Sequence, residues 1–303
     1  YKEDHAQANR APRTAIGIKA DGTVVLFVSD GRNIPVAVGM TMYELADIMI
    51  QLGCVVATNC DGGGSSTFLS EREGTGELTM KNTPSDGSER ATLHGLLVVS
   101  QAVPSGEFDH ATVSPSDEYY TPGSSVELTA TAVDYSGSVA EAMPEGVTWA
   151  VTDETMGTVT AGELSGNIAK ATFVSSGKEG PVTVQLLKDG VVVGSTTLEI
   201  RHPDSLAFKS DNVNLAYEEV TDLGLYARYQ GNEIHLKAED IDWDISDSKA
   251  GAFDGLLFHV TDDYLASVTT TVTAVYKADT DLWAATRINV GMQPAIVMDG
   301  GDA

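Results

Sequence analysis

Two hydrophobic patterns run through the first hundred residues, an alternation typical of strands and one helical repeat. In TAIGIKADGTVVLFVSDGR (14–32), apolar positions alternate on both sides of an Asp-Gly dipeptide, which predicts two strands joined by a hairpin. TMYELADIMIQLG (41–53) begins with a Thr-x-x-Glu capping box and has apolar residues at helical spacing, so it predicts a helix that stops at its final glycine. CVVATNC (54–60) and HGLLVVS (94–100) predict two further strands.

The pattern changes after about residue 108. Short β-rich runs separated by turn residues follow, as in SVELTATAVD (125–134) and PVTVQLLKDGVVVGSTTLEI (181–200), and they predict a small antiparallel sandwich. RHPDSL (201–206) has the composition of a linker, the same β texture returns behind it, and no helix of similar quality follows the first one. We therefore expect a β-rich multidomain chain with an α+β module (1–102) and two all-β sandwiches (108–202 and 206–303).

Composition narrows the range of partners. The chain has 303 residues and a net charge of −26, and residues 1–100 contribute little of that excess with 8 basic and 12 acidic side chains. Nucleic acid is an unexpected partner because phosphate backbones are bound by clusters of Lys and Arg. No apolar run approaches the ~20 residues of a membrane span. The start YKEDHAQANR resembles neither a signal peptide nor a native N-terminus, so we expect the chain to be a fragment.

The two cysteines, Cys54 and Cys60, stand at the ends of one predicted strand. Extended chain of this length spans about 20 Å, whereas a disulfide needs Cα atoms within roughly 7 Å. We expect no disulfide between them. No other Cys or His lies nearby to complete a metal site, so we expect both cysteines to be buried structural thiols.

The stretch DGGGSST (61–67) follows that strand and is the first candidate for chemistry. It is not a Walker A loop, because no Gly-Lys-Ser/Thr follows, and it is not a G-x-S-x-G nucleophile elbow. Consecutive backbone N–H groups and three hydroxyls can bind anionic oxygens, with Asp61 beside them as a base or nucleophile. The alternative is a structural turn that Asp61 caps.

Three other segments carry candidate residues. Arg13 and Thr14 precede the first strand of the hairpin and Asp30 and Arg32 follow the second, so the two arginines either form an anion clamp or belong to an ordinary surface. The loop NTPSDGSER (82–90) either lines a cleft or is solvated. Its candidate side chains are Asn82, Ser85, Asp86 and Arg90. His94, at the start of an apolar run, is expected at the edge of the core.

Together, four segments resemble the C-terminal half of the phosphodiester glycosidase family. They are PRTAIGI, VSDGR, VGMTMYELADIMIQLGCVVATNCDGGGSST and NTPSDGSERATLHGLLVV, in that order within about residues 9–100. The chain departs from the family pattern in lacking the upstream region, in Cys60, where leucine is commoner, and in His94, where asparagine is common.

The resemblance implies hydrolysis of a sugar-1-phosphodiester. A phosphate monoester is already a good leaving group, with a pKa near ~6, so a dedicated acid is less necessary than in ordinary glycosidases. One carboxylate would then activate water or attack C1: Asp61, with Asp30 and Asp86 as competitors. No cofactor is expected, and a metal requirement is left open. The implied substrate-binding residues are Arg13, Thr14, Arg32, Asn59, Gly62, Gly63, Gly64, Ser65, Ser66, Thr67, Ser85 and Arg90.

The later regions suggest a setting for this module. Residues 111–200 resemble a bacterial immunoglobulin-like repeat, and residues 206–303 read as a second one or as a carbohydrate-binding sandwich. This arrangement resembles that of secreted or wall-attached bacterial proteins, so an extracellular or cell-wall location and a wall polysaccharide partner are expected. The competing function is a wall-associated carbohydrate-binding or adhesion protein whose glycosidase-like module is incomplete. An exposed Trp243 or Trp283 would favour sugar binding.

Overall fold

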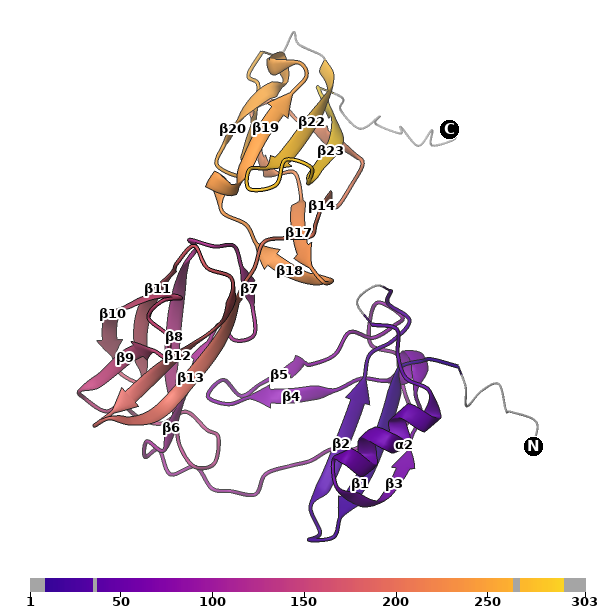
Figure 1. Ribbon diagram of the computed structural model, residues 1–303, viewed down its shortest axis with the longest axis vertical. Helices are drawn as coiled ribbons and strands as arrows, with labels where there is room; N and C mark the ends of the chain where they lie inside the picture. Colours follow the sequence, from indigo (N-terminus) through magenta and orange to yellow (C-terminus); the bar gives the residue numbers. More distant parts are fainter. Residues whose placement is uncertain (1–8, 35–36, 264–267, 292–303) are drawn as a thin grey trace, which may run out of the picture. The chain divides into compact units, whose positions relative to one another are not determined.

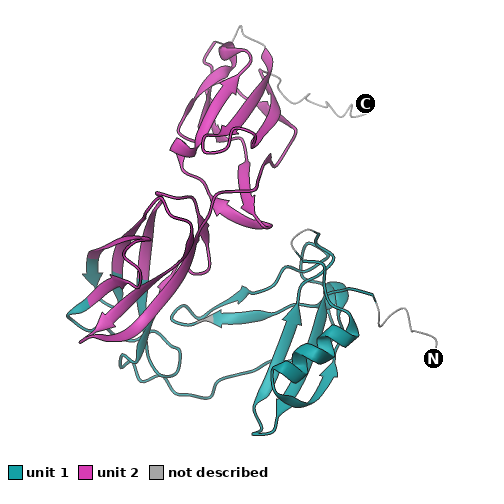
Figure 2. Ribbon diagram, viewed as in Figure 1, with its two compact units in different colours: residues 1–112, 130–147, 163–169 teal, residues 113–129, 148–162, 170–303 magenta. Residues whose placement is uncertain are grey.

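The computed structural model describes residues 9–34, 37–263 and 268–291. Its elements are drawn in Figure 1. Two compact units make up the chain: the first comprises residues 1–112, 130–147 and 163–169, and the second comprises residues 113–129, 148–162 and 170–303 (Figure 2). Strands dominate throughout, and no helix lies between residues 111 and 200. The predicted β-rich, multidomain class is therefore confirmed, while the three boundaries proposed from the sequence stay predictions.

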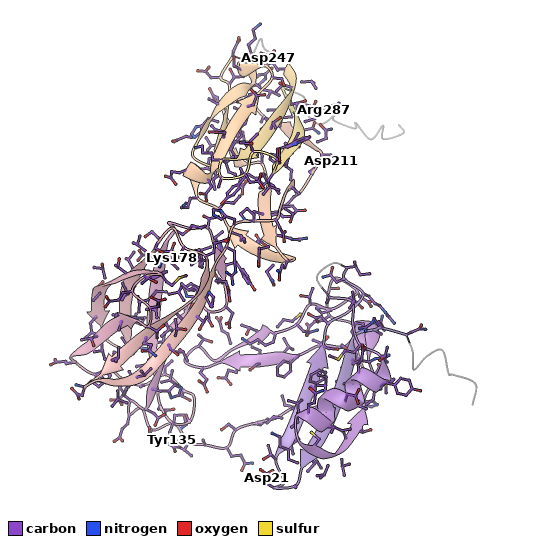
Figure 3. All side chains as sticks on the ribbon, viewed as in Figure 1. Asp21, Tyr135, Lys178, Asp211, Asp247 and Arg287 are labelled. Atoms are coloured by element: carbon purple, nitrogen blue, oxygen red, sulfur yellow. The ribbon has the colours of Figure 1, made fainter. Side chains whose placement is uncertain are left out.

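The first unit contains the predicted hairpin and helix. Strands β1 (Arg13–Lys19), β2 (Val24–Ser29) and β3 (Cys54–Asn59) form an antiparallel sheet of order β2-β1-β3, and helix α2 (Met42–Gln51) lies on one face of it (Figure 1). Thr41 and Glu44 form the capping box at the start of α2. At the β1–β2 turn, the labelled Asp21 accepts a hydrogen bond from the Thr23 N–H at 2.9 Å (Figure 3).

Between α2 and the sheet lies a small core. Ala15, Leu45 and Met49 are its buried residues, and Cys54 packs against them. A Cβ added at Gly17 would collide with Met49 and Cys54, so the helix approaches the sheet closely there. The cysteines are free, as predicted, but both are partly exposed rather than buried.

The opposite face of the sheet is apolar and exposed. Ile18 pairs with Val24 on one side and with Val56 on the other, and cross-strand partners lie on the same face. These three residues are 45%, 58% and 64% exposed. Only the α2 side of the sheet is thus covered within the described chain.

The strand predicted for HGLLVVS does not form. Residues 94–100 have no regular secondary structure and belong to no sheet, and Leu96–Val99 are exposed. Four consecutive apolar residues are typical of a strand with both faces covered. In the described structure neither a ladder partner nor a covering layer lies against them. The polar stretch before them contains a hairpin that the sequence reading did not identify, β4 (Leu69–Arg72) and β5 (Glu77–Met80).

Residues 110–200 form two facing sheets, with a core that includes Leu128, Phe173 and Leu198. One sheet has the order β10-β11-β8-β6, and the other includes β7, β13, β12 and β9. The bounds are β6 (His110–Ser114), β7 (Tyr119–Tyr120), β8 (Ser125–Val133), β9 (Val147–Val151), β10 (Gly157–Ser165), β11 (Ile168–Ser175), β12 (Gly180–Lys188) and β13 (Val191–Ile200).

Residues 205–290 have a separate core around Phe258, Val272, Tyr276 and Ile288. Trp243 packs in it, stacked on Phe253 with ring centroids 3.7 Å apart. The strands are β14 (Ser205–Phe208), β15 (Asn212–Leu215), β16 (Val220–Asp222), β17 (Leu225–Tyr229), β18 (Asn232–His235), β19 (Ile241–Ile245), β20 (Gly251–Asp254), β21 (Leu257–Val260), β22 (Val268–Tyr276) and β23 (Trp283–Val290).

Within the second unit, one sheet runs through both sets of strands. β7 pairs in parallel with β13 and also with β18, which produces the order β14-β17-β18-β7-β13-β12-β9. The segment read as a linker is hydrogen-bonded here: Arg201 N–H donates to Tyr120 O at 2.9 Å, and Asp204 N–H donates to Arg228 O at 2.8 Å. The segment with the composition of a linker is therefore hydrogen-bonded to β7 and β17, and it forms a joint between the two sets of strands.

Candidate functional site

The glycine loop begins where β3 ends and stays beside the start of β1. Cys60 N–H donates to Thr14 O at 2.8 Å and Gly63 N–H donates to Pro12 O at 3.0 Å. A Cβ at Gly62 would lie 2.9 Å from Pro12 O, so this glycine allows a close approach within the chain itself. Sequence reasoning missed Pro12, because its contribution is a backbone oxygen.

Side chains from two other loops cover the backbone of the next two glycines. Gly63 has φ +65°, and a Cβ there would lie 3.2 Å from Arg32 Nη1. At Gly64, which is buried, a Cβ would collide with the Asp86 carboxylate and the Arg90 guanidinium. The glycines are thus required because Arg32, Asp86 and Arg90 pack directly on the loop.

Arg90 is held at the loop by contacts with two residues. Its Nε donates to Asp86 Oδ2 at 3.0 Å, its Nη2 forms an ion pair with the same carboxylate, and its Nη1 donates to Ser65 Oγ at 3.4 Å. The pair is half exposed. Asp86 therefore orients a guanidinium towards the loop while leaving part of that guanidinium open to solvent.

Asp30 fastens the 82–90 loop to the end of β2. Both of its carboxylate oxygens accept the Thr83 N–H, at 3.0 and 2.9 Å, and Oδ1 also accepts Asn82 Nδ2 at 3.0 Å. Asn82 donates in addition to Ser66 O at 3.0 Å. The carboxylate of Asp30 is thus occupied by the loop that carries Asp86 and Arg90.

Asp61 differs from the other two candidate carboxylates. It is exposed, and its Oδ1 accepts the N–H of the adjacent Gly62 at 3.0 Å. In the described part of the chain, no other hydrogen bond or ion pair engages it. Of the three acids predicted for catalysis, Asp61 is the one whose carboxylate remains available.

Several predicted substrate-binding residues are engaged within the chain. Arg13 donates to Met40 O at 2.9 Å and to Asn9 O at 2.8 Å, and Asn59 donates to Cys60 O at 2.7 Å. The Thr14 hydroxyl donates to that of the buried Ser66 at 3.1 Å. These contacts use two of the five N–H donors of Arg13 and one of the two of Asn59, and they help to shape the loop.

Backbone donors of the loop are largely used too. The N–H groups of Gly62, Gly63, Ser65 and Ser66 donate to oxygens of this same region. A nest of consecutive free N–H groups is therefore not what the loop offers, and side chains are the main anion donors. The Ser85 hydroxyl, beside Asp86 in sequence, is buried without a hydrogen-bond partner in the described chain.

The remaining predictions have simpler outcomes. His94 is exposed rather than at a core edge, and its carbonyl accepts the Thr92 hydroxyl at 3.2 Å. Thr67, at the end of the loop, is partly exposed. Over the described ranges, no group of three His, Cys, Asp or Glu residues is placed to hold a metal ion. The helices described there are also too short or too polar to cross a bilayer.

Comparison with known proteins matches this region to a family. Residues 1–99 match the family model described as phosphodiester glycosidase, which confirms the resemblance seen in the motifs. The chain is 38% identical over 87 residues to the SPbeta prophage-derived uncharacterized protein YomE of Bacillus subtilis, covering 29% of this chain and 12% of that protein. It is 42% identical over 57 residues to human N-acetylglucosamine-1-phosphodiester alpha-N-acetylglucosaminidase, covering 19% and 11%.

Solved structures resemble the chain weakly. The Escherichia coli adhesin FdeC aligns over 77% of each chain with 15% identity and a TM-score of 0.27. The Yersinia pseudotuberculosis adhesin InvE aligns over 59% of this chain and 58% of its own, with 16% identity and a TM-score of 0.25. Likenesses at this level carry no functional argument.

Proposed function

Because residues 1–99 match the phosphodiester glycosidase family, we propose that this region hydrolyses a sugar-1-phosphodiester and that Asp61 is its catalytic carboxylate. One observation carries the assignment. Asp30 and Asp86 are held by the 82–90 loop and by Arg90, whereas Asp61 is exposed beside the same glycine loop with one hydrogen bond from its neighbour. A base or nucleophile needs an accessible carboxylate oxygen, and Asp61 offers one.

Arg90, Arg32 and the Ser65 hydroxyl would bind the phosphate. Arginine forks match phosphate oxygens, and hydrogen bonds between charged groups are stronger than neutral ones. With Asp61 as a general base, its carboxylate takes a proton from water as the water oxygen bonds to C1. The bond from C1 to the phosphate oxygen breaks, and the phosphomonoester leaves with the electron pair. With Asp61 as a nucleophile, its own oxygen bonds to C1 first and water then releases the sugar.

Asp86 and Asp30 have positioning roles in this proposal. Asp86 fixes the guanidinium of Arg90 at the loop, and Asp30 fixes the segment from which both residues project. A carboxylate whose oxygens are already engaged by these partners is a weaker candidate for proton transfer from a bound water.

The proposed substrate is a sugar-1-phosphodiester of a glycan, an exopolysaccharide or a wall polymer. The human relative's name specifies N-acetylglucosamine-1-phosphodiester, and the match covers 11% of that protein, so for this chain the proposal names only the substrate class. An extracellular or wall-attached bacterial setting belongs to the same proposal.

A second candidate function is carbohydrate binding by the later strands. Trp283, at the start of β23, is 59% exposed, and an exposed indole is a surface on which sugars stack. Trp283→Ala would then weaken retention on a polysaccharide column while leaving hydrolysis unchanged, and equal retention would exclude this role for Trp283.

The test of the enzyme proposal is a kinetic comparison on a panel of sugar-1-phosphodiesters. Asp61→Asn keeps the side-chain shape and removes the charge, so turnover should fall about 10²–10⁴-fold with a smaller change in KM. Asp47→Asn, an exposed acid on α2, is the matched control and should keep wild-type turnover. Near wild-type turnover in Asp61→Asn, with an inactive Asp30→Asn or Asp86→Asn, would mean that another carboxylate acts.

A further inference from the structure

β3 is an edge strand with an apolar character. It is the last strand in the order β2-β1-β3, so its outer backbone groups have no ladder partner in the described chain. Val55 and Val56 are 65% and 64% exposed along it. An exposed apolar edge is a template for pairing with another strand, and native proteins normally cover or charge such edges.

A second segment, residues 94–99, also exposes apolar side chains and has no strand partner in the described chain. Leu96, Leu97, Val98 and Val99 are between 64% and 78% exposed, in a segment without regular secondary structure that belongs to no sheet. No charged residue or proline occurs between His94 and Ser100. Runs of this kind are stable in water only when paired and covered.

Residue 94, where this segment begins, is close in sequence to a contact near the C-terminal end of β3. The glycine loop follows directly after Asn59, and Arg90 contacts that loop through Ser65. Residue 94 is therefore only four residues from an anchor near the C-terminal end of β3. Six extended residues cover about 20 Å, so residues 94–99 have the same length as β3.

We propose that residues 94–99 pair antiparallel with the free edge of β3 and complete a four-stranded sheet. With His94 beside Asn59, Leu97 lies opposite Val56 and extends the apolar face that α2 leaves uncovered. A segment of the same chain is favoured over a second copy because Arg90 already holds it close, which removes most of the closure entropy.

Cysteine crosslinking tests the pairing. In a Cys54→Ser/Cys60→Ser background, Val56→Cys is combined in turn with Leu96→Cys, Leu97→Cys and Val98→Cys. A disulfide needs Cα atoms within roughly 7 Å, so an intramolecular bond should form with Leu97→Cys, or with one of Leu96→Cys and Val98→Cys if the register shifts by one. Leu26→Cys on β2, combined with Leu97→Cys, is the control and should stay reduced.

Hydrogen exchange of the wild-type chain tests the same strand pairing without any substitution. Backbone amides that enter the ladder should exchange at least tenfold more slowly than those of Gln101 and Val103, which lie outside any sheet. Fast exchange throughout residues 94–99 together with no crosslink would overturn the proposal. Disulfides formed between two chains rather than within one would overturn it as well, in favour of a second copy at the edge.

Discussion

The carboxylate of Asp30 accepts the backbone N–H of Thr83 with both oxygens, at 3.0 and 2.9 Å, across 53 residues of sequence. This contact ties the end of β2 to the loop that carries Asp86 and Arg90. Asp30→Ala should cost about 1–3 kcal/mol locally, since it leaves the N–H and the Asn82 amide without their acceptor. The amide of Thr83 should then exchange faster. Unchanged exchange would show that another acceptor takes over.

A substitution at Gly64 probes the packing on the glycine loop. Gly64→Ala introduces a Cβ where the Asp86 carboxylate and the Arg90 guanidinium now lie, so the pair must move away. Affinity for a phosphodiester inhibitor, measured by calorimetry, should fall about 10–100-fold, which corresponds to one lost charge-assisted hydrogen bond. Gly177→Ala is the matched control, because a Cβ at Gly177 meets nothing within 4 Å. Equal affinity in both variants would remove the pair from the binding site.

The joint inside the second unit depends on Asp240. Its carboxylate accepts the Thr121 hydroxyl at 2.5 Å and the Lys237 N–H at 2.9 Å. Asp240→Ala should lower the free energy of unfolding by about 1–3 kcal/mol and speed trypsin cleavage after Arg201. The control is Asp242→Ala, whose side chain is 70% exposed, with an ion pair to Lys277 at 3.4 Å. Rapid cleavage after Arg201 in the wild type would restore the linker interpretation.

Lowering the pH should increase the rate of local opening of residues 105–106. Hydrogen bonds from the Ser136 hydroxyl and from the N–H groups of Gly106 and Ser105 hold the pKa of the buried Asp134 carboxyl well below its usual range. A carboxyl with a folded pKa below its unfolded value of about 3.9 stabilises the fold above that pH, and this stabilisation declines as pH falls further.

The prediction is a faster opening of this segment below about pH 4, measured by hydrogen exchange of Ser105 and Gly106 after correction for intrinsic rates. Asp134→Asn should open it already at pH 7 and show no further acid step. The neighbouring Tyr135, labelled in Figure 3, donates to Val103 O at 2.7 Å and serves as the second anchor. An acid step that persists in Asp134→Asn would assign the change to another group.

Local signals predicted the local elements correctly. The Asp-Gly turn and the Thr41–Glu44 capping box each specify their structure within a few residues, and both formed. The run at 94–100 is unpaired in the structure and the segment at 201–206 is hydrogen-bonded to strands, and neither could be read from the local sequence because pairing depends on partners that are distant in sequence. A run of apolar residues indicates what could be buried, but not whether a partner is present.

The sequence predicted which loops carry the candidate residues, but not the role of each residue. The family resemblance named Asp61 as the carboxylate with Asp30 and Asp86 as competitors, and the contacts of Asp30 across 52 and 53 residues and of Asp86 with Arg90 distinguish the three. The sequence likewise did not indicate that Arg13 would be occupied by carbonyl oxygens of Asn9 and Met40. Side-chain chemistry names the candidates, whereas long-range hydrogen bonding decides which of them remains available.

Two residues, Tyr119 and Tyr120, join the strands on either side of β7 into one sheet. A force that slides β13 past β18 would load the hydrogen bonds on both flanks of β7 in shear, so they would resist together rather than open one by one. The Thr121–Asp240 contact lies directly behind and shares that load. Under tension the second unit should therefore resist extension until the hydrogen bonds of β7 break together. One of its shortest strands should thus determine its mechanical strength.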